Sequence, residues 1–359
     1  MEGAAYLRFA RGGFRPGVRR LSPERSRAMT MTGIVPELIP LARALEEGLP
    51  IAREPFHDVA RGLGRPETWV VENARAMIDS GYIRHFGAFF DYRALGLRGY
   101  LFGADLPPDC KKSVISRLTG MSGVTHLYGR RHYLGTWFTA LLAGEACALD
   151  LCGFLRSAGC RFVALETALR IKLRPVFAER GGIGPETNPP GSPLVGGRLE
   201  GRLLEIARAL QGGMGVSSRP FDRAGDISGI GWHELLDGAK SLAGLGILRK
   251  IGASLNHIRA GWTSNSLCAF DASGIGDDEA AELARRAVSN LPWASHCYLR
   301  RVFDSDLSRG WPYNLYIMIH ATSEGELGGR ERTLRDKLPG FGFTSLRTEE
   351  EHLKRLFRI

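Results

Sequence analysis

The sequence predicts an α+β protein built as a tandem repeat, in which each half holds a winged helix-turn-helix unit followed by a ferredoxin-like βαββαβ domain. Two observations support this fold class. The stretch "SGYIRHFGAFFDYRALG" (80–96) returns as "LGILRKIGASLNHIRAG" (245–261), with glycine and arginine in matching places. In both halves, segments with the apolar spacing of helices come first and alternating segments follow. The 359-residue chain is therefore expected to hold two copies of one unit.

The first part of each half has the pattern of three short helices. The first half contains "PELIPLARALEEG", "EPFHDVARGLG" and "RPETWVVENARAMIDSG", and the second contains "LEGRLLEIARALQGG", "RPFDRAGDISG" and "GWHELLDGAKSLAGLG". Glycine or proline marks each break. An alternating, hairpin-like run follows, "GYIRHFGAFFDYR" in the first half, and completes the pattern of a winged unit. We expect winged helix-turn-helix units at 33–96 and 198–261.

The second part of each half predicts strand, helix, two strands, helix and strand. The phrases "VTHLYGRR" (124–131) and "ASHCYLRR" (294–301) each precede an aromatic, apolar strand, "TWFTALLAG" or "WPYNLYIMIHA". Each half then closes on a basic strand. This order predicts ferredoxin-like domains at 97–178 and 262–359. We expect the two halves to pack as a pseudo-dimer through their sheets.

Two segments fall outside the repeat. Residues 179–197 are rich in Gly, Pro and Ser, which is typical of a flexible linker. Residues 1–32 are rich in arginine, and we expect a disordered tail or a start codon assigned too early, with Met29 or Met31 as the true start. A transit peptide is the alternative. Because the chain has no apolar signal region and no apolar run long enough to span a membrane, a cytoplasmic location is expected.

The composition limits the partners and the chemistry. A formal net charge of +10 favours a polyanionic partner, either nucleic acid, a membrane surface or a small molecule with several carboxylates. The six cysteines form no CxxC and no Cys/His cluster with zinc spacing, so we predict neither disulfides nor a structural metal. The sequence also lacks a Walker A motif, a dinucleotide-binding glycine motif after a strand, a nucleophile elbow and HExxH.

The predicted architecture resembles the Lrp/AsnC regulators, so DNA binding is the first hypothesis to weigh. A recognition helix enters a groove lined with phosphates and normally carries basic or amide side chains. Here the first such helix has Glu67, Glu72 and Asp79 against Arg75. The second has Glu234 and Asp237 against Lys240. Both helices carry a net negative charge, which disfavours a role in reading DNA.

The repeated phrase favours a second hypothesis, a site for a polycarboxylate. Side chains alternate along a strand, so His126, Tyr128 and Arg130 share one face, and His296, Tyr298 and Arg300 share the equivalent face. Arginine binds carboxylates through a fork of donors, tyrosine offers an aromatic surface with a polar tip, and histidine transfers protons near neutral pH. Each residue alone is typical of a structural strand position or a solvated edge, but the repetition of all three favours a function.

Aromatic residues begin the strands that follow the two phrases. Trp137 starts one strand, and Trp311 and Tyr313 start the other. These rings either stack on a flat ligand or fill the core, and the sequence leaves both interpretations open.

The phrases "GYIRHFGA", "VTHLYGRRHYLGTWFT" and "SHCYLRR…GWPYNLYIMIHA" resemble the siroheme decarboxylase family, a group of Lrp/AsnC-related proteins. The resemblance covers both halves. The second half resembles the WPYN-type subunit and the first its partner type, so the chain looks like a fusion of two subunits that usually pair. It implies removal of CO2 from two acetate groups of siroheme to give 12,18-didecarboxysiroheme, in heme d1 synthesis or in the siroheme-dependent heme route. No cofactor or metal beyond the iron of the substrate is implied.

The resemblance also implies roles for individual residues. His126 and His296 are the expected proton donors or iron-proximal groups, with Arg130 and Arg300 as carboxylate clamps at the reacting centre. The expected substrate-binding residues are Arg84, Tyr128, Arg131, His132, Trp137, Arg249, Tyr298, Arg301, Trp311, Tyr313 and Asn314. The first half lacks WPYN and has an additional histidine, His132, so the two halves need not share one role. Which half catalyses stays open.

Three partner questions follow from this hypothesis. We expect a siroheme- or heme-like tetrapyrrole as the ligand, and neither nucleic acid nor a membrane as a partner. Association of two chains, or pairing with related subunits, is left open by the sequence. A heme- or siroheme-binding regulator without catalysis is the remaining alternative, because it would share the pocket and differ only in proton delivery.

Overall fold

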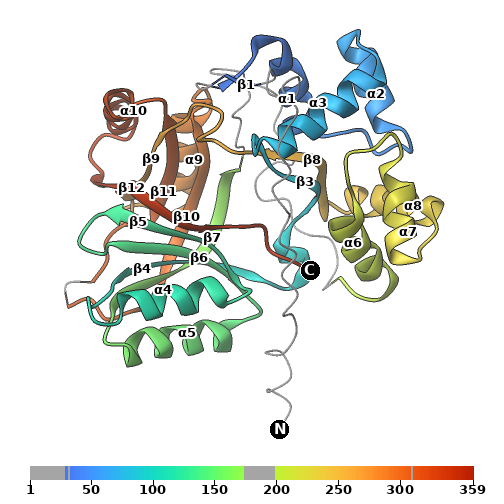
Figure 1. The fold of residues 1–359 in the computed structure, drawn as a ribbon. Helices are drawn as coiled ribbons and strands as arrows, with labels where there is room; N and C mark the ends of the chain where they lie inside the picture. Colours follow the sequence, from blue (N-terminus) through green and yellow to red (C-terminus); the bar gives the residue numbers. More distant parts are fainter. Residues whose placement is uncertain (1–28, 31–32, 174–198, 309) are drawn as a thin grey trace.

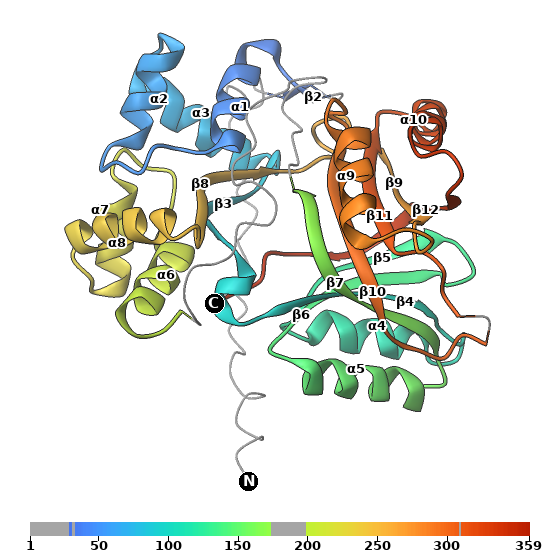
Figure 2. The same ribbon diagram turned by 180° about the vertical axis from the view of Figure 1, so that it is seen from behind.

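The computed structural model describes residues 29–30, 33–173, 199–308 and 310–359 (Figure 1). The predicted linker (179–197) and almost all of the predicted tail (1–32) lie outside the described residues. Within the described residues, no helix is long and apolar enough to cross a membrane. The helices of the two helix-turn-helix units lie together on one side of the molecule, and the long strands lie on the other, in both views (Figures 1 and 2).

Each half begins with a three-helix unit, as the sequence predicts. The bounds are α1 (Ile39–Glu47), α2 (Pro55–Leu63) and α3 (Glu67–Asp79), then α6 (Gly201–Gly213), α7 (Pro220–Ser228) and α8 (Trp232–Gly244). A short strand pair, β1 (Met29–Thr30) and β2 (Gly33–Ile34), and the 3₁₀ turn η3 (Pro36–Leu38) precede α1. Proline starts α2 and α7, and a left-handed glycine, Gly64 or Gly229, ends each. Both units share one apolar core, in which Phe56 and Phe221 are fully buried.

The wing differs from the hairpin-like run that the sequence suggests. β3 (Ile83–Phe90) and β8 (Leu248–Leu255) each contribute a single strand, and the two pair antiparallel with Gly87 opposite Gly252. The hairpin expectation is therefore wrong in this detail, because each strand finds its partner in the other half. Glycine is required at position 252 for a steric reason, because a Cβ there would lie 2.5 Å from the carbonyl oxygen of Leu45. The pair joins the two helical units above the barrel.

The remainder of each half is a βαββαβ domain, which confirms the predicted fold class. The first comprises β4 (Arg98–Asp105), α4 (Lys111–Gly120), β5 (Val124–Arg131), β6 (Thr136–Leu142), α5 (Glu145–Ser157) and β7 (Arg161–Leu173), and the 3₁₀ turn η4 (Tyr92–Leu95) precedes it. The second comprises β9 (Ser264–Asp271), α9 (Asp277–Val288), β10 (Ala294–Ser305), β11 (Leu315–Ala321), α10 (Glu324–Lys337) and β12 (Gly342–Lys354). The strand orders β5-β6-β4-β7 and β10-β11-β9-β12 are equivalent.

The two sheets close into one eight-stranded barrel. The last strand of each half pairs with the second strand of the other, so β7 lies beside β10 and β12 lies beside β5. The contacts are equivalent in register, since Arg170 lies opposite Tyr298 and Glu351 lies opposite Tyr128. The halves thus meet through their sheets as an internal pseudo-dimer.

Alternation along the strands separates two environments. Outward apolar side chains pack beneath the helices: Leu127 and Phe138 lie in the cluster with α4 and α5, and Cys297 and Ile317 lie in the cluster with α9 and α10. Inward side chains form a smaller apolar cluster around Trp137 and otherwise are polar or charged. The polar part of the barrel interior contains the repeated phrases.

Candidate active site

The repeated phrases line the inside of the barrel. His126, Tyr128 and Arg130 point inward from β5, because Leu127 packs outward against the helices and side chains alternate from there. A register shift between Val124 and His126 lets Val124 pack outward as well. On β10, the outward residues Cys297 and Leu299 leave His296, Tyr298 and Arg300 facing the same interior. The fold therefore brings the six residues into one polar part of the barrel interior, which we call the barrel chamber.

Arg130 and Arg300 occupy equivalent places deep in the barrel chamber. The Nη1 atom of Arg130 donates to Thr348 Oγ1 (3.0 Å), and that of Arg300 donates to Thr167 Oγ1 (2.8 Å). Each guanidinium also lies over the tyrosine of its own phrase, with about 5 Å between its Cζ and the ring centroid (5.0 and 4.9 Å). Burial lowers the pKa of Arg130 to about 10 and lowers the pKa of Arg300 as well.

Neither of these two arginines has all its donors satisfied. Among the described residues, the Nε atoms of Arg130 and Arg300 are buried and have no hydrogen-bond partner. A buried donor without a partner costs about 1–3 kcal/mol, and more when it is charged. An anionic ligand bound between these two donors would complete their hydrogen bonds.

The histidines of the two phrases are held through the same ring atom. His126 Nδ1 lies 3.0 Å from Thr125 Oγ1 and 3.1 Å from Thr139 Oγ1. His296 Nδ1 lies 2.6 Å from Ser295 Oγ. Because the Nδ1 atom of each ring contacts a threonine or serine hydroxyl of the barrel wall, Nε2 is the nitrogen that each imidazole can offer to a ligand. Burial first, and nearby Lys354 second, lower the pKa of both histidines to about 3.

The paired wing strands add two arginines to the barrel chamber. Arg84 comes from β3 and Arg249 from β8, and the Nε atom of each is buried without a partner among the described residues. Arg84 donates to Glu351 Oε1 at 2.6 Å. Beside the second phrase, the register position equivalent to that of Glu351 is held by Arg170. Arg170 forms an ion pair with Asp91 at 3.2 Å. The two sides are therefore equivalent in shape but differ in charge.

Several residues of the barrel chamber carry no signal in the sequence. Lys354 lies opposite His126 across β12 and β5, and its Nζ lies 3.1 Å from His257 Nδ1. Burial, with Arg84 nearby, lowers the pKa of Lys354 to about 8. His320 is 4% exposed, and its Nε2 lies 2.9 Å from Ser295 Oγ. These residues reach the site through strand pairing between distant segments, which no local motif reveals.

Three expected substrate-binding residues lie elsewhere. Arg131 and Arg301 follow the inward arginines, so the alternation of the strand turns them outward. Their side chains are 67% and 73% exposed and form ion pairs with Glu349 and Asp277. Asn314 accepts a hydrogen bond from the backbone N–H of Ala272 at 2.8 Å, which fixes a strand end. The structure does not place these three side chains with the histidines.

The aromatic residues that follow the phrases close one end of the barrel. Trp137 is 1% exposed and donates to the Leu134 carbonyl, and Trp311 is 7% exposed and donates to Tyr316 Oη. Their ring centroids lie 5.5 Å apart. His132 and Tyr313 lie against the ring of Trp311, at 5.7 and 5.1 Å. These contacts are those of a packed apolar layer that forms the floor of the barrel chamber.

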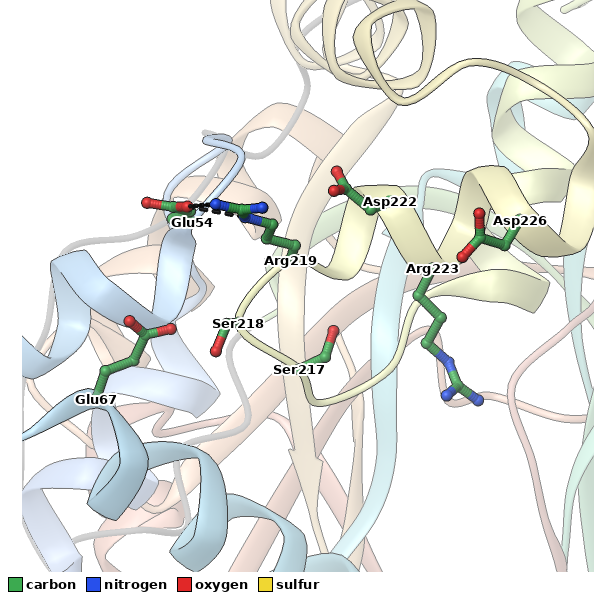
Figure 3. A pocket seen from close by; sticks show the side chains of 8 residues that line it. All are labelled: Glu54, Glu67, Ser217, Ser218, Arg219, Asp222, Arg223 and Asp226. Carbon is green, nitrogen blue, oxygen red and sulfur yellow. Dashed lines mark hydrogen bonds and ion pairs between the residues drawn. The ribbon is translucent and has the colours of Figure 1, made fainter.

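A cavity of about 670 Å³ lies between the two helical units (Figure 3). Its lining carries four carboxylates and two guanidiniums: Glu54, Glu67, Ser217, Ser218, Arg219, Asp222, Arg223 and Asp226. Glu54 and Arg219, which the repeat makes equivalent, form an ion pair across it at 2.8 Å, as Figure 3 shows. This excess of carboxylates suits a polyanionic ligand poorly, so we assign the site to the barrel chamber.

Comparisons with known proteins bear on both parts of the molecule. The siroheme decarboxylase NirDL-like HTH domain matches residues 41–84, and the AsnC-like ligand binding domain matches residues 259–352. The chain is 25% identical over 301 residues to the siroheme decarboxylase of Hydrogenobacter thermophilus, which covers 80% of this chain and 84% of that protein. It is 32% identical over 137 residues to the siroheme decarboxylase NirH subunit of Pseudomonas aeruginosa, covering 38% of this chain and 74% of the subunit.

The chain belongs to the siroheme decarboxylase family. A crystal structure of the siroheme decarboxylase NirDL has the same fold, with a TM-score of 0.65 and 20% sequence identity, and covers 90% of this chain and 94% of its own. A second crystal structure of NirDL, in co-complex with an iron-uroporphyrin III analogue, gives a TM-score of 0.63 over the same shares. Membership of the family agrees with the two-fold repeat, and the predicted fusion of two subunit types is consistent with relatives named as α, β and NirH subunits.

Proposed function

We propose that this protein is a siroheme decarboxylase, a carboxy-lyase that removes CO2 from two acetate side chains of siroheme to give 12,18-didecarboxysiroheme. One observation carries the proposal: among the described residues, four arginines of the barrel chamber each have a buried Nε donor without a partner, namely Arg84, Arg130, Arg249 and Arg300. The eight carboxylates of siroheme are the acceptors that such donors lack. Membership of the family supports the same substrate.

Charge in the barrel chamber fits a polyanionic substrate. Around the two phrases lie the cations Arg84, Arg130, Arg170, Arg249, Arg300 and Lys354. The carboxylates that face them among the described residues are Asp91 and Glu351. Binding of siroheme would offset the repulsion among these cations. Carboxylates that do not react supply binding energy, which can be used to desolvate the one that does.

Loss of CO2 from an acetate on a pyrrole leaves a carbanion that the macrocycle delocalises, and a proton must then reach the carbon. His126 and His296 offer Nε2 to the barrel chamber, which makes them the candidate proton donors. A positioned acid typically contributes about 10²–10⁴ in rate. Burial first, and repulsion by nearby cations second, lower the pKa of both histidines. Bound carboxylates would act against the second cause and favour the protonated form.

The proposal includes no cofactor beyond the substrate, whose own iron enters and leaves with it. Fusion of both subunit types in one chain supplies both histidine phrases without a second chain. We place the reaction in heme d1 synthesis or in the siroheme-dependent heme route. A cytoplasmic location fits six cysteines that are all free thiols.

A DNA-binding regulator is the alternative, and the surface of the helical units argues against it. Glu67 begins α3 and lines the acidic cavity, and Glu234 on α8 is in an ion pair with Arg202 at 2.6 Å. The positions that would read bases thus carry negative charge, which a duplex repels. A tetrapyrrole-binding regulator without catalysis would share the barrel chamber and is separated from the enzyme by activity alone.

The test is an anaerobic incubation of the purified protein with siroheme, followed by mass spectrometry of the extracted tetrapyrrole. We expect a product lighter by two CO2, and its loss in the His126→Ala/His296→Ala double variant. Siroheme that binds but stays unchanged would favour the regulator that senses tetrapyrrole. A protein that ignores siroheme and binds duplex DNA would contradict the proposal altogether.

A further inference from the structure

The two candidate proton donors have different groups behind them. Ser295 Oγ bridges His296 Nδ1 at 2.6 Å and His320 Nε2 at 2.9 Å, so a second imidazole stands behind the first. In the first half, Thr125 Oγ1 and Thr139 Oγ1 contact His126 Nδ1 and each other, at 2.9 Å. The strand register of β6 places Leu141 where β11 has His320.

The second imidazole belongs to a longer buried row. His320 and Ser295 are 4% and 1% exposed. The rings of His320 and His257 meet edge to face with centroids 5.6 Å apart, and His257 Nδ1 lies 3.1 Å from Lys354 Nζ. Lys354 is half-buried at the end of β12, near the wing strands. Titratable groups therefore continue from His296 to the edge of the barrel chamber.

The single proton of the Ser295 hydroxyl couples the states of the two rings. If Ser295 donates to His296 Nδ1, the ring of His296 carries its proton on Nε2, and His320 Nε2 must then donate to the serine. If His296 Nδ1 donates to the serine, Nε2 of His296 is bare and the serine donates to His320. Only the first arrangement presents an acidic N–H to the barrel chamber.

We propose that His320 and Ser295 position the proton of His296 on Nε2 and supply a proton to Nδ1 as that proton leaves, which keeps the ring neutral and makes the second half the one of the two half-sites with its own proton source. The inference rests on the proposed decarboxylase function. His320 and Ser295 are positioning residues that act through His296. In the first half Thr125 takes the place of Ser295, and its hydroxyl and that of Thr139 fix the ring of His126, but Leu141 in the place of His320 supplies no proton.

The proton transfers balance in one step per CO2. The C–C bond of the acetate breaks, CO2 leaves, and the electron pair stays on the methylene carbon. That carbon takes the Nε2 proton of His296, the hydroxyl proton of Ser295 moves to His296 Nδ1, and the Nε2 proton of His320 moves to Ser295 Oγ. His320 begins as the neutral ring with its proton on Nε2, because burial lowers its pKa well below the ordinary value, and it takes a proton on Nδ1 as it gives up the one on Nε2. That proton comes from Lys354 by way of His257, and water then reprotonates Lys354.

Single-turnover decarboxylation of siroheme by the full chain tests the relay. Ser295→Ala removes the bridge, Ser295→Thr keeps it, and His320→Gln keeps a hydrogen-bonding group but no titratable one. In Ser295→Ala and His320→Gln we expect the product lacking one CO2 to accumulate, because loss of the other CO2 slows on the order of 10²-fold. Ser295→Thr should restore the rate. His233→Gln, at an exposed histidine on α8, is the matched control and should behave as wild type.

The solvent isotope effect and the tautomer of His296 give readouts that a merely structural role would not move. The solvent isotope effect on the slower CO2 loss should indicate that more than one proton is transferred in that step in the wild type. In His320→Gln it should indicate a single proton. In ¹⁵N-histidine spectra of the protein alone, Ser295→Ala should shift the His296 Nδ1 signal, whereas Thr125→Ala should not. Wild-type rates for both CO2 losses in Ser295→Ala and His320→Gln would overturn the relay while leaving the decarboxylase intact. If the wild type released no CO2, both proposals would fall together.

Discussion

Arg84 and Arg249 occupy equivalent places in the repeat, yet the same substitution should affect them in opposite ways. Arg84 is in an ion pair with Glu351, whose Oε1 accepts at 2.6 Å. At the equivalent register position Arg249 meets Arg170 instead, and burial together with that second cation lowers the pKa of Arg249. Arg84 therefore stabilises the fold, whereas Arg249 destabilises it. A bound ligand would offset that loss of stability.

The structure sets the expected magnitudes. A buried donor without a partner costs about 1–3 kcal/mol, so Arg249→Met should raise the free energy of unfolding by about 1 kcal/mol while keeping most of the aliphatic packing. Arg84→Met leaves Glu351 without its cation. Because these side chains are 24% and 22% exposed, the loss should be about 2 kcal/mol, below the ~3–5 kcal/mol for a fully buried pair. A charged hydrogen bond contributes about 1.5–3 kcal/mol, so Arg249→Met should weaken siroheme binding about 10- to 100-fold.

Urea unfolding of both variants and anaerobic titration with siroheme, followed by absorbance, measure the two effects. The diagnostic result is a variant that is more stable than wild type and binds siroheme less tightly. If Arg249→Met lost as much stability as Arg84→Met, Arg249 would have a partner within the fold and the reasoning would be wrong. An unchanged dissociation constant would show that the substrate does not reach Arg249.

Three further predictions follow from the same structure. Trp137→Ala opens a cavity in the floor of the barrel chamber and should lower the free energy of unfolding by about 3–5 kcal/mol, measured in urea, whereas Trp137→Phe should lose much less. His126 and His296 have folded pKa values of about 3 against 6.5 unfolded, so the unfolded chain binds more protons between those values and stability falls as pH drops from 6.5 toward 3. His126→Gln should reduce that slope by up to about 1.4 kcal/mol per pH unit, and an unchanged slope would contradict the assignment. Arg131→Ala removes an exposed ion pair outside the barrel chamber and should change siroheme affinity by less than ~2-fold. A large loss of affinity would show that Arg131 contacts the substrate.

Local periodicity was enough to predict which residues of the candidate site share a face. The period of two along a strand predicts that His126, Tyr128 and Arg130 share a face, and repetition of the phrase marks the second set. The same period turns Arg131 and Arg301 away from that face, so their expected role conflicted with the alternation that placed the others. The expectation for these two came from grouping the arginine pairs as one clamp rather than from the geometry of the strand.

Pairing between distant strands was beyond the reach of the sequence. Alternation predicts that 83–90 forms a strand, but its partner in the other half depends on how two copies of the unit meet. The same holds for Arg170 and Lys354, which enter the barrel chamber only because β7 and β12 cross to the opposite half. His320 lies in an apolar strand, where a lone histidine is most often structural, and only the distance to Ser295 reveals its connection to His296.

The differences in charge and in titratable groups between the two half-sites lie outside the repeated phrases. At equivalent register positions the second half has Glu351, Lys354 and His320 where the first has Arg170, Leu173 and Leu141. Histidine, tyrosine and arginine are the same in both phrases. Two copies of an identical chain would present the same supporting residues twice. A single chain that carries both halves can keep one chemistry in the phrases and vary the charges and proton sources behind them. The proposed substrate has two reacting acetates in different surroundings on one macrocycle, and a pair of inequivalent half-sites is the arrangement that can treat them differently.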